Sequence, residues 1–209
     1  MMNAPLTSLL DLAPVIPVVT LEDVRHAAPL ARALLAGGVE VIELTLRTPA
    51  ALACLRAIAD EVPEIVLGAG TVLDAEQADA AVAAGAGFVV TPGVTPALLR
   101  HLPGLGVPAL PGAATVSEAL TLLEAGISEL KFFPAGPAGG PAYLSALAGP
   151  LPQVRFCPTG GISAGNAADY LALPNVGCVG GSWLTPRDAL AAQDWARVTE
   201  LARATLDLR

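Results

Sequence analysis

The sequence of 209 residues contains a single lysine, Lys131, although it contains ten arginines. Arginine is never deprotonated in proteins and cannot act as an amine nucleophile. It can therefore replace lysine at a surface, but not in a reaction in which a neutral amine attacks the substrate. Two interpretations follow. Either Lys131 remains by chance at the surface, or it performs a reaction that requires an amine.

Charged and aromatic residues are also few, at 14% and 4% of the chain. Because 54% of the residues are hydrophobic, the chain can form a large core, which excludes a disordered protein. The net charge of −8 argues against a nucleic-acid binder, since such proteins present a basic surface. We therefore expect a globular protein in which a local cluster of donors holds any anionic ligand.

Long uninterrupted apolar segments are absent. Two stretches without charge, 80–99 and 132–154, are broken by glycines and prolines, so neither can satisfy its backbone hydrogen bonds in lipid. No secretory signal is recognisable, and three cysteines without metal-ligand spacing suggest reduced thiols. These absences predict a cytoplasmic protein with no membrane contact and no metal site. The cysteines, expected as small core residues, are Cys54, Cys157 and Cys178.

Short runs of branched apolar residues recur at nearly even spacing and predict eight strands. They are Val15–Val19, Val39–Thr45, Ile65–Ala69, Phe88–Thr91, Val107–Leu110, Glu129–Phe133, Val154–Pro158 and Val176–Gly180. The intervals carry helix signals, which include capping residues and terminal glycines. The expected helices or caps are Leu21–Ala36, Thr48 with Pro49, Asp74–Ala84, Thr95–His101, a Thr115/Glu118 capping box before Ala119–Ala125, Gly139–Ala148, and Ser163.

Alternating strands and helices predict a parallel sheet, and eight units with right-handed crossovers can close into a barrel. An open doubly wound sheet is the alternative, but no GxGxxG fingerprint follows the first strand. We expect an α/β fold, a single (β/α)8 TIM barrel domain over residues 1–209 with a short N-terminal helical extension. In such a barrel the carboxyl ends of the strands carry the site.

The second predicted strand contains charged residues. Glu43, Thr45 and Arg47 alternate along it and therefore share a face. A carboxylate inside an apolar strand is costly unless it is used or paired. This strand is thus expected to deliver a carboxylate to the barrel interior and a guanidinium near its mouth. An internal Glu43–Arg47 ion pair is the alternative.

Lys131 lies within a predicted strand and is followed by two phenylalanines, Phe132 and Phe133. An apolar pocket disfavours the charged ammonium, and the neutral amine attacks carbonyls to form a Schiff base. The alternative is a buried lysine that pairs with Glu43 or binds an anion as a fixed charge. Since His26 and His101 fall in or beside predicted helices, acid–base chemistry falls to Glu43 or to water held by it.

A Gly-Gly pair stands at the end of each of the last two predicted strands. Gly160–Gly161 is followed by Ser163 after one intervening residue, and Gly180–Gly181 is followed directly by Ser182. Phosphate sites of barrels are commonly built from the loops after strands seven and eight, where glycine amides donate to the oxygens. Tight packing turns are the alternative. Thr71 and Thr91 stand at the ends of the third and fourth strands, where a turn or a ligand contact is possible.

Five ordered segments resemble the motifs of one family, the 2-keto-3-deoxy-6-phosphogluconate (KDPG) aldolases of the Entner–Doudoroff pathway. They are ELTLRT (43–48), GAGTV (68–72), KFFPA (131–135), FCPTGGI (156–162) and GGSW (180–183). The similarity extends from about Val15 to Leu206. It implies a class I aldolase, a homotrimer of barrels without metal or other cofactor, which cleaves this phosphorylated keto acid to pyruvate and glyceraldehyde 3-phosphate.

The resemblance also implies a role for each matching residue. Lys131 forms the Schiff base, and Glu43 is the general acid–base that acts through a bound water. Arg47 and Thr71 bind the carboxylate end of the substrate, and Pro92 lines the same pocket. The phosphate cradle consists of Thr159, Gly160, Gly161, Gly181 and Ser182.

One position departs from the family pattern, because Gly136 follows KFFPA where relatives often have an acidic residue. A second substrate, 4-hydroxy-2-oxoglutarate (KHG), is compatible with the same Schiff-base end and would give pyruvate and glyoxylate. Two other classes stay open at this point. They are a phosphate-binding barrel isomerase or epimerase, in which Lys131 is only electrostatic, and a sugar-phosphate-binding protein without turnover.

Overall fold

The structure is a computed structural model that describes residues 8–208. Its paired strands are all parallel and alternate with helices along most of the chain, as predicted. The strands are β1 (Val15–Val19), β2 (Val41–Thr45), β3 (Val66–Gly70), β4 (Phe88–Val90), β5 (Ala109–Leu110), β6 (Gly112–Ala113), β7 (Glu129–Phe132), β8 (Arg155–Pro158) and β9 (Val179–Gly181).

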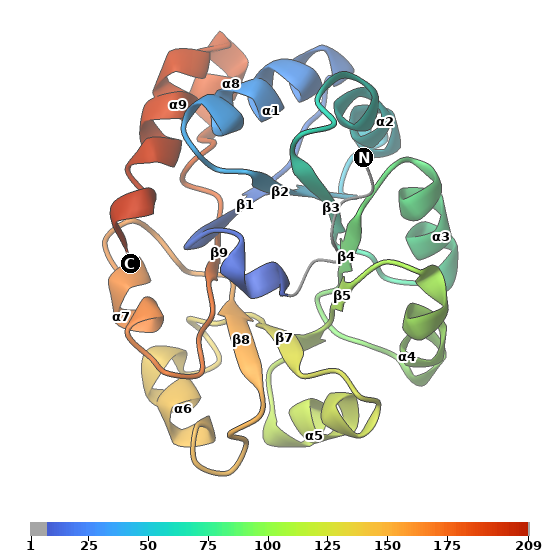
Figure 1. Cartoon of the computed structure of the whole chain (residues 1–209), viewed down its shortest axis with the longest axis vertical. Coiled ribbons are helices and arrows are strands. Elements are labelled where there is room, and N and C mark those ends of the chain that lie inside the picture. Colours follow the sequence, from blue (N-terminus) through green and yellow to red (C-terminus); the bar gives the residue numbers. More distant parts are fainter. Residues whose placement is uncertain (1–7, 209) are drawn as a thin grey trace.

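The helices lie outside the strands, which are arranged around the centre of the molecule (Figure 1). They are α1 (Ala27–Ala36), α2 (Ala51–Glu61), α3 (Ala75–Ala83), α4 (Pro96–His101), α5 (Val116–Glu124), α6 (Gly140–Leu147), α7 (Ala167–Leu171), α8 (Arg187–Ala192) and α9 (Trp195–Arg203). Short 3-10 helices cover Leu9–Asp11, Val24–His26, Leu102–Leu105 and Leu206–Leu208.

The strands form two hydrogen-bonded sheets and not one continuous eight-stranded ladder. The larger sheet has six strands in the order β5-β4-β3-β2-β1-β9, and the smaller has three in the order β6-β7-β8. The fold is therefore an α/β fold with a curled parallel sheet. Isolated parallel bridges join Phe156 to Val176 and Thr159 to Gly180, between the β8 and β9 segments.

Pro111 explains why the predicted fifth strand is divided. Proline has no N–H to donate to a ladder, so pairing is interrupted where it occurs. On one side Ala109 of β5 pairs with β4, and on the other Gly112 of β6 pairs with β7. The carbonyl of Pro111 still accepts a hydrogen bond from the Lys131 amide at 2.9 Å. The predicted run Val107–Leu110 thus continues to Ala113 with a break.

Most of the predicted helix ends are confirmed. Thr115 and Glu118 form the predicted capping box, and Asp74 and Thr95 cap α3 and α4 through their side chains. Two predicted caps are wrong. The Thr48 hydroxyl donates to the carbonyl of Leu21 instead of capping α2, and α7 begins after Asn166.

The segment before β1 covers the amino ends of β7 and β8. The Ser8 hydroxyl lies 2.5 Å from Glu129 Oε1 at the start of β7, and Asp11 forms an ion pair of 2.6 Å with Arg155 at the start of β8. In this segment the predicted helical extension is the 3-10 helix Leu9–Asp11, while the part over residues 1–7 lies outside the described residues. The carboxyl ends of the strands lie at the opposite end of the ring.

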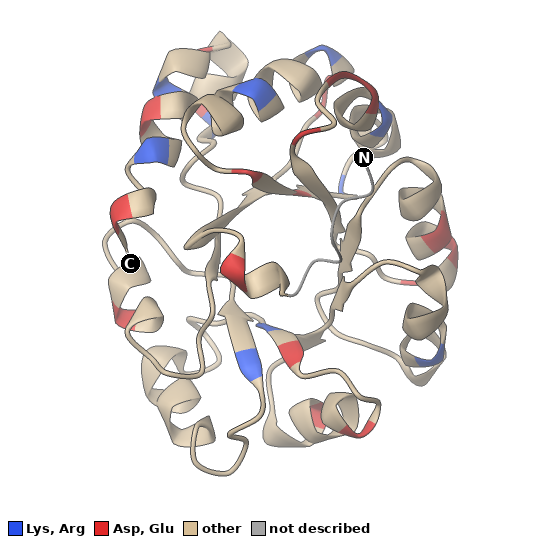
Figure 2. Cartoon of the chain, viewed as in Figure 1, with Lys and Arg blue, Asp and Glu red and all other residues tan. Residues whose placement is uncertain are grey.

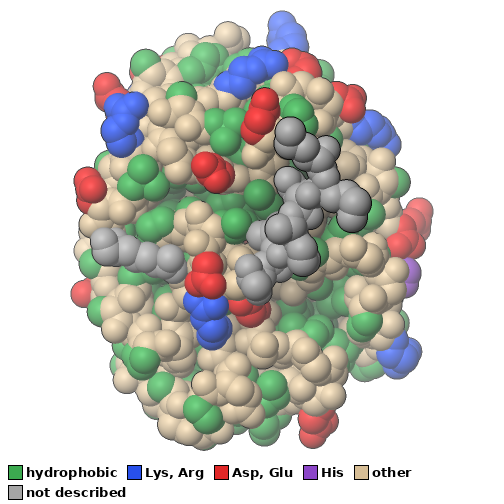
Figure 3. Space-filling view, in the orientation of Figure 1, with side chains coloured by type: hydrophobic (Ala, Val, Ile, Leu, Met, Phe, Trp, Pro, Cys, Tyr) green, Lys and Arg blue, Asp and Glu red, His purple; other side chains and the backbone are tan. Residues whose placement is uncertain are grey.

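Charged residues lie mostly on the outer helices and loops (Figure 2). On the face in Figure 3, acidic and basic side chains are interspersed and form no continuous basic patch. The three cysteines are buried, and burial raises the pKa of the Cys54 thiol, which favours an unreactive core role. Within residues 8–208 no helix is long and apolar enough to cross a membrane.

Candidate active site

Lys131 is buried in the interior of the strand ring. Its side chain is 3% exposed, and its neighbours in register are Gly112 of β6 and Cys157 of β8. The next residue, Phe132, points to the other face of β7, where its ring stacks on Tyr143 of α6 at 5.6 Å. Because strand residues alternate between faces, this packing fixes Lys131 toward the interior.

Glu43 reaches Lys131 from β2, on the opposite side of the ring (Figure 1). Lys131 Nζ lies 3.2 Å from Glu43 Oε1, and both side chains are 3% exposed. The predicted inward orientation of Glu43 is confirmed. The arrangement brings an amine and a carboxylate into contact in a buried site, so a proton can pass between them.

Gly70, in the GAGT segment of β3, makes room for this carboxylate. A Cβ at position 70 would lie 2.1 Å from Glu43 Oε1, which is far inside van der Waals contact. Glycine at this point of the strand is therefore required by the position of Glu43. The space beside Gly70 is thus filled by a side chain of the protein.

Arg47 lies beyond the end of β2 and contacts Thr71 instead of Glu43. Its Nε donates to Thr71 Oγ1 at 3.0 Å, so the alternative of a Glu43–Arg47 ion pair is wrong. Thr71 has a φ of 59°, a left-handed conformation that is unfavourable for a β-branched residue. Strain at such a position is characteristic of functional sites. Here it holds the Thr71 hydroxyl against the guanidinium.

The TGG segment follows β8 and is shaped by glycines. Gly160 and Gly161 have φ values of 94° and 80°, which side chains other than glycine rarely adopt. Successive backbone amides in such a loop can form a concave donor site for an anion. Thr159 packs against Gly180, where a Cβ would lie 2.2 Å from its Oγ1.

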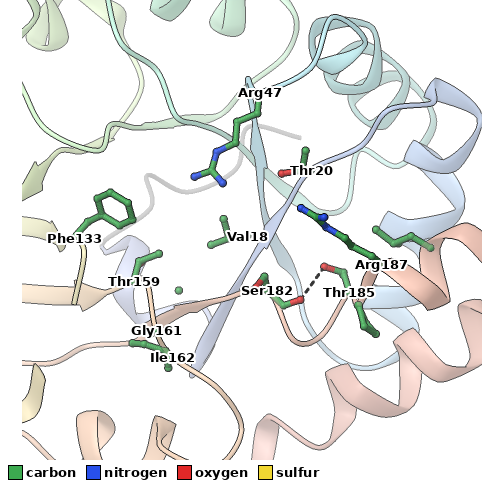
Figure 4. A pocket seen from close by; sticks show the side chains of 14 residues that line it. Val18, Thr20, Arg47, Phe133, Thr159, Gly161, Ile162, Ser182, Thr185 and Arg187 are labelled. Carbon is green, nitrogen blue, oxygen red and sulfur yellow. Dashed lines mark hydrogen bonds between the residues drawn. The ribbon is translucent and has the colours of Figure 1, made fainter. Parts of the chain in front are cut away.

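A cavity of about 380 Å³ opens at the carboxyl ends of the strands (Figure 4). Its lining includes five of the residues that the sequence singled out, which are Arg47, Thr159, Gly160, Gly161 and Ser182. Phe133 also lines it and connects it to the buried pair, because Lys131 Nζ lies 5.4 Å from the centre of the Phe133 ring. The cavity and the buried pair therefore belong to one site.

The other predicted binding residues lie beside this cavity and do not line it. Thr71 reaches it through Arg47. The backbone of Pro92 packs over Gly112, the neighbour of Lys131, where a Cβ would meet the Pro92 carbonyl at 2.3 Å. Gly181 is packed against the ring of Trp183.

The sequence analysis missed three polar residues of the cavity, which are Thr20, Thr185 and Arg187. Thr20 follows β1, and its hydroxyl lies 2.7 Å from that of Thr45. Its place at the end of the first predicted strand was a usable signal, because strand ends carry barrel sites. Thr185 and Arg187 come after the GGSW motif, so no motif marked them. The side chains of Arg47 and Arg187 both point into the cavity (Figure 4).

Neither histidine lines this cavity. His101 pairs with Asp79 at 2.8 Å, and His26, which lines a neighbouring cavity with Arg187, lies 3.3 Å from the Gln193 amide. In the described part of the chain, no group of three His, Cys, Asp or Glu side chains is arranged to hold a metal ion.

Solved structures define the class of protein. The KDPG aldolase from Legionella pneumophila, solved with pyruvate captured at low pH as a covalent carbinolamine intermediate, is similar with a TM-score of 0.93 and 46% identity. The similarity covers 94% of this chain and 96% of that one. The KDPG aldolase of Zymomonas mobilis ZM4, solved with 3-phosphoglycerate, has a TM-score of 0.91 and 44% identity, with coverages of 96% and 94%. The chain is an aldolase, an enzyme that breaks a carbon–carbon bond.

The sequence comparisons give the family. The model of the KDPG and KHG aldolase family matches residues 6–201. The KHG/KDPG aldolase of Escherichia coli (strain K12) is 52% identical over 200 residues, which cover 96% of this chain and 94% of that relative. This chain belongs to the KDPG and KHG aldolase family.

Proposed function

We propose that this enzyme is a class I aldolase that cleaves KDPG to pyruvate and glyceraldehyde 3-phosphate through a Schiff base on Lys131. The contact of 3.2 Å between Lys131 Nζ and Glu43 Oε1 in a buried site carries the proposal. A nucleophile beside a base is the arrangement that covalent catalysis requires. The carbinolamine trapped in the Legionella relative supports it, since a carbinolamine forms when an amine adds to a ketone.

Glu43 accepts a proton from the Lys131 ammonium, and the neutral amine attacks the C2 ketone of the substrate. Glu43 then returns the proton to the carbinolamine hydroxyl, which leaves as water, so that a protonated imine forms and Glu43 is again a carboxylate. The C3–C4 bond then breaks, its electrons pass into the iminium to form an enamine, and the C4 hydroxyl loses its proton to Glu43 through water. Glyceraldehyde 3-phosphate leaves. Protonation of the enamine at C3 and hydrolysis of the imine release pyruvate and regenerate Lys131.

Arg47, Thr71 and Pro92 bind and position the carboxylate end of the substrate. Arg47 lines the cavity, and because only its Nε is engaged by Thr71, its terminal nitrogens are oriented for a carboxylate. Pro92 packs over the neighbour of Lys131 and restricts the space in which the keto acid can lie.

The phosphate end lies against the glycine loops. The amides of Gly160 and Gly161 and the hydroxyls of Thr159 and Ser182 provide donors, and Gly181 allows the turn against Trp183. The presence of 3-phosphoglycerate in the Zymomonas structure supports a phosphorylated acid as the ligand class.

We further propose that the chain acts as one cytoplasmic (β/α)8 barrel domain and assembles as a homotrimer, as the family resemblance implies. The bridges between β8 and β9 and the continuation of β5 into β6 support closure of the two sheets into a barrel. Sedimentation equilibrium should give three times the 21.0 kDa chain mass, and a monomer would contradict the trimer.

A second substrate, KHG, is favoured by one observation, the 52% identity to a relative named KHG/KDPG aldolase. KHG shares the keto-acid end that Lys131, Glu43 and Arg47 contact and lacks the phosphate. We expect cleavage of KHG with a lower kcat/KM, because the donors at the glycine loops then have no anion to bind.

The test is a cleavage assay with KDPG in the presence of a metal chelator, in which pyruvate and glyceraldehyde 3-phosphate are both quantified. Equal amounts of the two products, with no loss of rate on chelation, are expected. Proton exchange without cleavage would instead indicate an isomerase or epimerase. Thermal stabilisation by the substrate without turnover would indicate a binding protein.

A further inference from the structure

We propose that Arg187, the first residue of α8, binds the phosphate group of the substrate and sets the preference of this enzyme for phosphorylated over unphosphorylated keto acids. The inference rests on the proposed function and adds a charged residue to a phosphate site whose other donors are neutral.

The cavity has a charge opposite to that of the whole protein. The chain has 19 acidic and 11 basic residues, yet the described residues that line the cavity include two arginines, Arg47 and Arg187, and no carboxylate. A ligand with an anionic group therefore finds a local positive potential in a protein whose net charge is −8.

The two arginines have different surroundings. Arg47 is held by Thr71 beyond the end of β2. Arg187 begins α8, which follows β9, and its side chain extends into the cavity beside Ser182 and Thr185 (Figure 4). Two cations that enter one cavity from different elements match a substrate with an anionic group at each end, a carboxylate and a phosphate.

Arg187 is not engaged by the carboxylates near it. Asp188, the next residue, forms an ion pair of 2.6 Å with Arg197. Glu22 and Asp23 share a neighbouring cavity with Arg187; Asp23 forms an ion pair of 2.6 Å with Arg25, and Glu22 forms none with Arg187. Throughout residues 8–208 no ion pair involves the Arg187 guanidinium. Its donors are thus available to a ligand.

The chemistry of guanidinium favours phosphate at this place. The amides of Gly160 and Gly161 and the Ser182 hydroxyl are uncharged, so they cannot balance a phosphate dianion. A guanidinium can bind two phosphate oxygens at once, and such charge-assisted bonds are roughly twice as strong as neutral ones. KDPG carries its phosphate on C6. KHG ends at a carboxylate next to C4, so it is too short to bring an anion to the Arg187 guanidinium.

The test compares Arg187→Gln with Arg100→Gln. Arg100 is an exposed arginine of α4, on the opposite side of the ring, so the second variant makes the same change of charge far from the cavity. The ratio of kcat/KM for KDPG to kcat/KM for KHG should fall about 10- to 100-fold in Arg187→Gln and stay at the wild-type value in Arg100→Gln. Arg187→Lys should recover part of the ratio. An unchanged ratio, or equal losses with both substrates, would overturn the proposal.

A binding measurement separates this proposal from the proposed reaction. Inorganic phosphate should raise the Tm of the wild-type protein and of Arg100→Gln, and this shift should be largely lost in Arg187→Gln. The measurement needs no turnover, so it decides the role of Arg187 even if neither substrate is cleaved, which would sink the proposed function alone. A phosphate-dependent shift that is equal in all three proteins would show that Arg187 does not contact the anion.

Discussion

A buried carboxylate needs both a partner and space, and in this protein the two come from different strands. Lys131 of β7 provides the partner of Glu43, and Gly70 of β3 provides the space. The alternation of side chains between the two faces of a strand was enough to predict that Glu43 points inward. The sequence could not show that Gly70 of the next strand lies against the Glu43 carboxylate, because that contact depends on how β2 pairs with β3.

We predict that Gly70→Ala impairs the reaction although it removes no functional group. The added Cβ would lie 2.1 Å from Glu43 Oε1 and would displace the carboxylate from Lys131. Its kcat should fall at least about tenfold, in the direction of Glu43→Gln, for which loss of a general acid–base predicts about 10²- to 10⁴-fold.

Steady-state kinetics of these variants check this, with Gly149→Ala as the control because a Cβ at that position meets nothing within 4 Å. Circular dichroism melts verify that each variant is folded. Wild-type kcat in a folded Gly70→Ala protein would show that the position of Glu43 does not matter for catalysis.

A second residue-scale prediction concerns the strained backbone of Thr71. Its φ of 59° costs about 1–2 kcal/mol for a β-branched residue, which is more than the roughly 0.5–1 kcal/mol that glycine costs in backbone entropy. Thr71→Gly should therefore unfold at the same or a higher Tm, while KM rises about tenfold because Arg47 loses its partner.

Gln193→Gly is the matched control, since Gln193 also has a positive φ, of 54°, and is absent from the lining of the cavity. It should keep both kinetic constants. If Thr71→Gly lowers Tm and leaves KM unchanged, the strain at this position serves the fold and not the site.

At the scale of elements, sequence signals predicted most strands and helices because each depends on local chemistry. The Thr115/Glu118 capping box and the Asp74 and Thr95 caps are examples. Predictions were wrong where a residue suited to a local role makes a tertiary contact instead. Thr48 has the right residue type for a cap, but its hydroxyl is satisfied by the carbonyl of Leu21.

The capping box gives a prediction about pH. The amide N–H of Ala114, followed by the hydroxyl and amide of Thr115, donates to Glu118 and lowers the pKa of this carboxyl below its ordinary value of 4.5. A carboxyl whose pKa is lowered in the folded state stabilises the protein above its unfolded pKa and loses that contribution as pH falls through the folded value.

Urea unfolding of wild type and Glu118→Gln should thus show a lower midpoint for the variant at pH 7. The difference should shrink once pH falls below 4.5 and disappear as pH falls through the lower pKa of the folded state. Glu124→Gln, at the other end of α5, lacks this cap and should show no such loss. A constant difference between wild type and Glu118→Gln down to pH 3 would contradict the assignment.

At the scale of the whole molecule, the sequence predicted a ring of alternating strands and helices but not how its hydrogen bonds would be divided. Pro111 interrupts the ladder because it has no N–H, and only isolated bridges join β8 to β9. The site spans these discontinuities, since Lys131 belongs to the smaller sheet and Glu43 to the larger. Arg187 lay beyond every motif, and only the folded chain places it in the cavity with Arg47.

The central claim is that the single lysine of this chain is the Schiff-base nucleophile. Incubation with pyruvate followed by borohydride reduction, digestion and mass spectrometry tests it most directly. We expect the mass of a reduced pyruvate adduct on the peptide that contains Lys131, and no adduct in Lys131→Arg, because a guanidinium does not form the imine. Absence of the adduct from the folded wild-type protein, or its persistence in Lys131→Arg, would contradict the account.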